Sequence, residues 1–195
     1  MESYDELLQP LALKPESLER VLGMKSEIHQ RGFLSVRHLL RSFGYTDQDL
    51  FYDEFGKPHL KDGKHISISH SFTFSGIAIS DSEIGIDIEK QRDKISIIAH
   101  KFVDYEFDYL DKEASNYIRK LTVIWCIKES LYKLFATPGM LFRDHFLVIP
   151  LCWKMEKPFH GLILTTINID SQGIFLNLKT LPVLIQFLLN DVDLS

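Results

Sequence analysis

Cysteine is scarce in this chain of 195 residues, where it occurs only as Cys126 and Cys152. Small secreted domains that depend on disulfides carry many more, so a disulfide scaffold is excluded and both residues are expected to be small buried hydrophobes. A basic excess is also missing, because the formal net charge is −5. Proteins that bind nucleic acid in bulk usually need a basic face, so no nucleic-acid partner is expected.

The sequence also lacks a pattern that would direct it to a membrane. Residues Met1–Glu6 are acidic and do not follow the basic-then-apolar order of a signal peptide. The most apolar late run, Leu181–Leu189, is too short to span a bilayer and is interrupted by Gln186. We therefore expect a cytoplasmic protein without a membrane partner.

The composition provides enough apolar material for an ordinary core. Hydrophobic residues make up 45% of the chain and charged residues 25%, which are typical values for a globular protein. The length fits one domain, or two small lobes packed as one unit.

Two stretches have the periodicity of helices. Apolar residues recur at spacings of three and four from Ser17 to Phe43, which predicts helical structure with an interruption near Gly32. Residues 95–135 are helical in character, and the strongest pattern is Tyr117–Phe135. The sequence Thr137-Pro138-Gly139 should end that helix, because proline lacks a backbone donor and glycine suits a cap.

The remaining segments read mainly as strands. Alternation and turn residues predict strands at His65–His70, Phe74–Ser80 and Ile84–Glu89, paired as an antiparallel meander. Later strands are expected at Asp144–Pro150, Gly161–Ile169 and Gly173–Leu178, while Thr180–Asn190 fits a strand or a short helix. This mixture of helices and strands indicates an α+β fold.

A pair of carboxylates lies on the third of these strands. Asp87 and Glu89 point to one face, because side chains alternate along a strand. Two carboxylates so placed repel each other unless a positive charge lies between them. A solvated acidic edge is the commoner reason for such a pair, and a magnesium ion is the functional alternative.

The strongest helix carries a second charged group. Glu129 lies one turn from both Trp125 and Lys133, so the three share a face. One interpretation is a surface ion pair. In the other, Glu129 is a metal ligand or general base and Lys133 contacts a phosphate. The helix alone does not choose between them.

A histidine and a lysine complete the candidate residues. His70 ends a strand among hydroxyl groups that suit an anion, although a lone histidine is more often structural. Lys57 lies in the turn Gly56-Lys57-Pro58 and by itself is an exposed lysine. The hydroxyl groups near His70 belong to Ser67, Ser69 and Ser71.

Taken in order, four segments resemble the signatures of the 4′-phosphopantetheinyl transferase superfamily, in its surfactin-synthetase-activating (Sfp-like) branch. The segments are Gly56–Pro58, Ser67–Ser71, Gly85–Glu89 and Trp125–Lys133. The last two match completely. Two departures are Ser67, where the family usually has asparagine, and an altered glycine-rich turn after Lys133.

The resemblance implies a reaction and a set of site residues. The phosphopantetheine arm of coenzyme A would move to a serine of an acyl or peptidyl carrier protein, releasing adenosine 3′,5′-bisphosphate. Magnesium would be held by Asp87, Glu89 and Glu129, and the catalytic residues would be Glu129, Lys133 and His70. Coenzyme A would be bound by Lys25, Arg31, Arg41, Lys57, Ser69, His70 and Lys133, with Arg37 a less certain match.

The resemblance also implies an architecture. The family fold is an α+β monomer of two similar halves with pseudo-twofold symmetry and an active site between them, here residues 1–90 and 91–195. One alternative is a degenerate module that only binds coenzyme A or a carrier protein. Another magnesium-dependent phosphoryl transferase is disfavoured, because the sequence contains no Gly-x-x-x-x-Gly-Lys-[Ser/Thr] loop.

Overall fold

The computed structural model describes residues 2–148, 162–170, 173–175 and 184–188. The chain divides into two compact units, one formed by residues 1–84 with 182–195 and the other by residues 85–181. Helices and strands occur in both, as the α+β interpretation requires. The pseudo-twofold symmetry and the halves at 1–90 and 91–195 stay predictions.

Three helices open the first unit. They are α1 (Tyr4–Leu8), α2 (Pro15–Leu22) and α3 (Glu27–Ser42). The predicted interruption near Gly32 is wrong, because α2 ends at Leu22 and Gly32 lies inside α3. A Cβ atom at Gly32 would be 3.7 Å from Cγ of His70. A methyl group there would make only an ordinary van der Waals contact, so α3 contains this glycine without requiring it. Phe33, Leu34 and Val36 are buried around it, and this burial keeps the segment helical.

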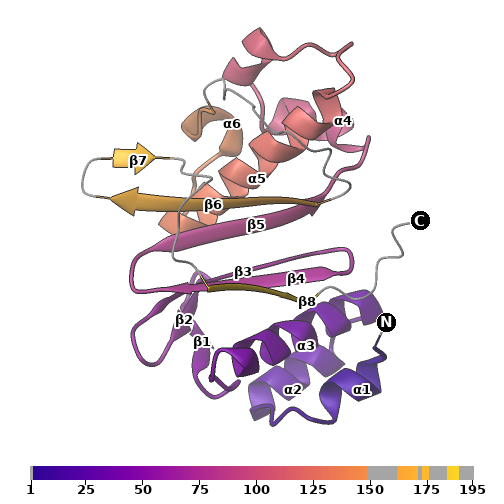
Figure 1. Cartoon of the computed structure of the whole chain (residues 1–195), viewed down its shortest axis with the longest axis vertical. Helices are drawn as coiled ribbons and strands as arrows, with labels where there is room; N and C mark the ends of the chain where they lie inside the picture. The colour runs from indigo at the N-terminus through magenta and orange to yellow at the C-terminus, as the bar shows by residue number, and fades with distance from the viewer. Residues whose placement is uncertain (1, 149–161, 171–172, 176–183, 189–195) are drawn as a thin grey trace. The chain divides into compact units, whose positions relative to one another are not determined.

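A five-stranded antiparallel sheet follows in the first unit (Figure 1). Its order is β1 (Leu50–Tyr52), β2 (Pro58–Leu60), β3 (His65–Ser71), β4 (Phe74–Ser80) and β8 (Leu184–Leu188). The predicted strands at 65–70 and 74–80 and their antiparallel pairing are confirmed. For 180–190, residues 184–188 form a strand, and the rest lies outside the described residues.

The predicted meander is wrong at its third strand. β5 (Ile84–Lys90) is absent from the five-stranded sheet, where β8 lies beside β4. β5 instead belongs to a three-stranded sheet with β6 (Leu162–Asp170) and β7 (Gly173–Phe175). A local pattern cannot reveal that a strand a hundred residues downstream takes the place beside β4.

The core of the first unit lies between α3 and the sheet. Its buried residues are Val36, Leu39, Leu40, Leu50, Leu60, Ile66 and Ile77. One buried ion pair joins it, with Arg37 Nε 3.0 Å from Asp47 Oδ1. Asp47 also accepts hydrogen bonds from the Lys14 backbone and the Ser17 hydroxyl, so it ties α2 to α3.

The second unit is arranged around a long helix, α5 (Tyr117–Phe135), whose predicted bounds are confirmed. Short helices accompany it: α4 (Ile95–Ile98), the 3₁₀ turns η1 (Ala99–Lys101) and η2 (Tyr105–Tyr109), and α6 (Phe142–His145). Figure 1 shows α5 along the sheet of β5 and β6. Ala136 ends α5 in the left-handed conformation, with φ 46°.

The later strand predictions have mixed outcomes. The strand expected at 144–150 is wrong throughout its described part, because α6 occupies residues 142–145 and residues 146–148 form no strand; residues 149–150 lie outside the described residues. The strand expected at 161–169 is confirmed over 162–169. The one expected at 173–178 is confirmed over 173–175, and its remainder is not among the described residues.

Gly85 allows β5 and α5 to come into backbone contact. A Cβ atom there would overlap the carbonyl group of Ser130 and lie 3.1 Å from Cβ of Leu134. No side chain larger than hydrogen fits without moving the strand away from the helix. The glycine of the Gly-x-Asp-x-Glu segment therefore sets the distance between the two elements that carry the candidate carboxylates.

A buried ion pair fixes α5 from its other side. Lys128 and Glu106 have fully buried side chains, and Lys128 Nζ is 2.7 Å from Glu106 Oε1. Lys128 also donates to the Phe102 carbonyl at 2.6 Å, while Glu106 accepts from the Val148 backbone at 2.9 Å. Burial lowers the pKa of Lys128, and its hydrogen bond to Glu106 opposes that shift. Lys128 is thus a structural cross-link next in sequence to Glu129.

Replacing Gly85 with alanine should destabilise the protein by about 1–3 kcal/mol or more, because the added methyl group overlaps the Ser130 backbone. Urea unfolding measures this change. Gly23→Ala is the matched control, since its Cβ would lie 3.4 Å from the nearest atom, and it should shift stability by less than about 0.5 kcal/mol. Equal effects of the two substitutions would disprove the close contact.

Lys128→Met should cost about 3–5 kcal/mol of unfolding free energy, because it leaves the Glu106 carboxylate buried without its counter-charge. Adding Glu106→Leu should recover most of that loss. The exposed pair Arg143–Asp104 supplies the control, and Arg143→Met should cost no more than about 1 kcal/mol. If Lys128→Met is no worse than Arg143→Met, the ion pair does not support α5.

Candidate active site

The acidic strand is β5. Asp87 is 4% exposed and Glu89 is half-buried, with the alternation of the strand placing them on one face. A solvated edge therefore does not describe Asp87. A carboxylate this deep needs hydrogen bonds or a positive charge to remain ionised.

Lys133 supplies that charge. Its Nζ lies 2.8 Å from Asp87 Oδ1 and 3.1 Å from the carbonyl oxygen of Ile86. The side chain is 27% exposed, against 6% for that of Asp87. The lysine of the Trp-x-x-Lys-Glu helix thus pairs across to β5, which the helix pattern alone did not indicate.

Glu129 lies half-buried one turn before Lys133. Burial raises its pKa to about 6; Lys133 opposes this shift, whereas Asp87 and Glu89 add to it. The three carboxylates are therefore close enough to influence one another, although burial is the main cause of the raised pKa of Glu129. Such a group can bind a cation.

The chemistry of these donors suits magnesium. All are carboxylate oxygens, the ligands that hard divalent cations prefer, and their mutual repulsion would fall when a cation binds. Within the described ranges, no three histidine, cysteine, aspartate or glutamate side chains form a ready metal cluster. Lys133 contacts one of the two Asp87 oxygens, Oδ1, and the metal assignment is a proposal.

Cys126 is a contact of this group that sequence reasoning missed. The predicted burial of Cys126 is confirmed. Its thiol also hydrogen-bonds to Asp87. Burial is the main cause that raises the pKa of the thiol, and the charge of Asp87 is the second. Cys126 precedes Lys133 by two helical turns, so helical spacing could have placed it on the same face. Cys152 lies outside the described residues.

Residues predicted to bind coenzyme A lie in the first unit, apart from Lys133. On β3, Ser69 is buried and His70 is exposed. Lys57 is the last residue of the β1–β2 turn, directly before β2, and its Nζ is 3.1 Å from Glu83 Oε2. These groups come from one sheet and its turns, whereas the candidate carboxylates belong to the second unit.

The basic residues in and between the N-terminal helices differ in exposure and in their partners. Lys25 and Arg41 are exposed, and Arg41 donates to the Pro10 carbonyl at 2.8 Å. Within the part of the chain that the structure describes, the buried Nε of Arg31 has no hydrogen-bond partner. Arg37 is 3% exposed and paired with Asp47, which makes it a structural residue rather than a phosphate ligand.

His70 lies beside α3 at Gly32, the residue after Arg31. A Cβ atom at Gly32 would be 3.7 Å from Cγ of the His70 ring. A basic side chain with an unused donor, a histidine and buried hydroxyl groups are suitable for an anion. The predictions that Arg31 and His70 bind coenzyme A are consistent with a phosphate site in the first unit.

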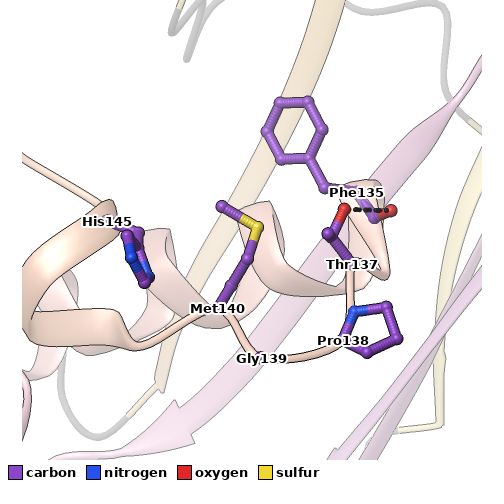
Figure 2. Close-up of a pocket in the computed structure, with 6 residues that line it drawn as sticks. All are labelled: Phe135, Thr137, Pro138, Gly139, Met140 and His145. Carbon is purple, nitrogen blue, oxygen red and sulfur yellow. Dashed lines mark hydrogen bonds between the residues drawn. The ribbon is translucent and has the colours of Figure 1, made fainter.

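An apolar recess lies past the end of α5 (Figure 2). It has a volume of about 440 Å³ and is lined by Phe135, Thr137, Pro138, Gly139, Met140 and His145. No candidate site residue lines it. It is formed by the segment where the sequence departs from the family's glycine-rich turn.

No described helix has the length and apolar character needed to cross a membrane.

Comparison with known proteins points to the same elements. Residues 83–169 match the family model described as the 4′-phosphopantetheinyl transferase superfamily. The 4′-phosphopantetheinyl transferase gsp of Aneurinibacillus migulanus is 31% identical over 126 residues, which cover 62% of this chain and 53% of that protein. The match thus spans about half the length of this relative. The range matched by the family model includes both β5 and α5, so the chain is similar to the superfamily where Asp87, Glu129 and Lys133 lie.

Proposed function

We propose that this chain is a 4′-phosphopantetheinyl transferase of the surfactin-synthetase-activating branch, a holo-acyl-carrier-protein synthase in activity. The observation that carries the proposal is the grouping of Asp87, Glu129 and Lys133 on two elements held in backbone contact. The superfamily match covers both elements. A cytoplasmic location and a monomeric state are further predictions.

The proposed reaction is a phosphoryl transfer. The hydroxyl oxygen of a carrier serine attacks the β-phosphorus of coenzyme A and forms a new P–O bond. The bond from that phosphorus to the bridging oxygen breaks. Adenosine 3′,5′-bisphosphate leaves with that oxygen, and the serine hydroxyl gives its proton to a base. Positioning and charge stabilisation dominate such a transfer, so charged groups matter more than a protein nucleophile.

In the second unit, Asp87, Glu89 and Glu129 would hold magnesium. That ion, when bound, would neutralise charge on the pyrophosphate oxygens. Glu129 would take up the serine proton, since a half-buried carboxylate whose pKa is raised to about 6 is a suitable base. Lys133 would place its ammonium group on the pyrophosphate or protonate the leaving oxygen.

In the first unit, the proposed role is to bind the phosphates of coenzyme A. The unused donor of Arg31 and the exposure of Lys25, Arg41 and His70 support this assignment. Arginine forms directional hydrogen bonds to phosphate, and lysine adds a point charge. Ser69 and Lys57 would complete the set.

Intact-protein mass spectrometry tests the proposal. The purified protein, coenzyme A, magnesium and an apo carrier protein should together increase the carrier mass by one phosphopantetheine group. The increase should disappear with a chelator, with a carrier whose serine is alanine, and with Glu129→Gln. Glu113→Gln, at an exposed position of the same unit, is the matched control and should retain activity.

The alternative is a module that binds coenzyme A or the carrier without catalysis. No mass gain across fatty-acid, polyketide and nonribosomal-peptide carriers, together with measurable coenzyme A binding, would replace the transferase with this module. Loss of both binding and mass gain would contradict the site assignment itself.

A further inference from the structure

Lys133 is held on β5 by two acceptors. Its Nζ contacts Asp87 Oδ1 at 2.8 Å and the Ile86 carbonyl oxygen at 3.1 Å. An ammonium group has three donors, so this arrangement uses two of them within the protein. The lysine thus points at the strand that carries the carboxylates.

In this position Lys133 is the counter-charge of the buried Asp87 carboxylate. The side chain of Asp87 is 6% exposed, and a carboxylate so buried is costly without a counter-charge. Lys133 provides that charge. Its ammonium group lies 2.8 Å from Oδ1 of the carboxylate that the proposed function assigns to magnesium, so a cation that binds Asp87 would meet a second positive charge there.

We propose that Lys133 and the divalent cation exchange at Asp87. Without a cation, Lys133 pairs with the Asp87 carboxylate and orients it. When a cation binds, the lysine leaves Asp87 and becomes available for a phosphate. This inference rests on the proposed function and adds an order to it, because the lysine reaches its substrate only after the cation has arrived.

The side chain is suited to such an exchange. Lysine carries a compact charge on a flexible four-carbon chain, and Lys133 is 27% exposed, so its head can leave toward solvent. The carboxylates stay compensated during the exchange, since the arriving divalent cation brings two positive charges and the departing ammonium group removes one. Lys128, with a fully buried side chain tied to Glu106, has no such freedom although it lies on the same helix.

Mn²⁺ binding without coenzyme A provides the first test, measured by isothermal titration calorimetry with Mn²⁺ as the probe. Lys133→Met should bind Mn²⁺ about fivefold more tightly than the unchanged protein, because the cation no longer displaces an ion pair. Lys120→Met, the same substitution on the same helix, should leave the affinity within about twofold of the unchanged protein. Equal or weaker binding by Lys133→Met would overturn the exchange.

A second measurement needs no variant and so does not depend on folding. Brief acetylation with acetic anhydride, read by peptide mass spectrometry, reports the accessibility of Lys133. Adding Mg²⁺ in the absence of coenzyme A should raise its labelling about threefold or more, on the scale of the ion pair that is lost, while Lys120 labelling stays constant. Unchanged labelling of Lys133 at saturating Mg²⁺ would show that the lysine remains on Asp87.

The outcomes separate this inference from the proposed function. If neither protein binds Mn²⁺, both the exchange and the carboxylate metal site are wrong. If the unchanged protein modifies a carrier protein but Lys133→Met binds Mn²⁺ no more tightly, the exchange alone is wrong. Tighter binding with increased labelling supports the exchange.

Discussion

The backbone contact between β5 and α5 is the constraint on which the rest of the candidate site depends. Because Gly85 has no side chain, the strand reaches the helix at Ser130. Only at this separation can Lys133 extend from the helix to Asp87 and to the carbonyl group beside it. The same closeness brings Glu129 within electrostatic reach of the strand carboxylates. A single glycine thus determines which charges meet.

Local sequence patterns predicted the elements well where structure follows from periodicity. Tyr117–Phe135 is long, its apolar residues recur at helical spacing and a Pro-Gly pair follows it, so its bounds were predicted to the residue. Errors arose where a distant partner decides the outcome. Gly32 lies inside a helix because the residues that follow it, Phe33 and Leu34 among them, are buried, and β5 leaves the meander because β8 pairs with β4. Neither this burial nor this pairing is visible in a short window of sequence.

In the candidate site, too, local patterns identified the residues but not their contacts with distant parts of the chain. Motif order identified Asp87, Glu129 and Lys133, and two of these form an ion pair in the structure. The sequence did not reveal how the charges are shared. Arg37 matched a basic pattern, yet it is buried against Asp47, because burial depends on packing and not on residue type. The support that Glu106 gives to α5 was missed for the same reason.

Anomalous diffraction from crystals grown with Mn²⁺ and coenzyme A would test the central claim most directly, namely that the β5–α5 contact builds a metal site. The account predicts an anomalous peak about 2.0–2.3 Å from oxygens of Asp87, Glu89 and Glu129. It also predicts that the Lys133 ammonium group lies on a phosphate. A metal peak elsewhere, or no peak while Lys133 still contacts Asp87, would contradict the claim.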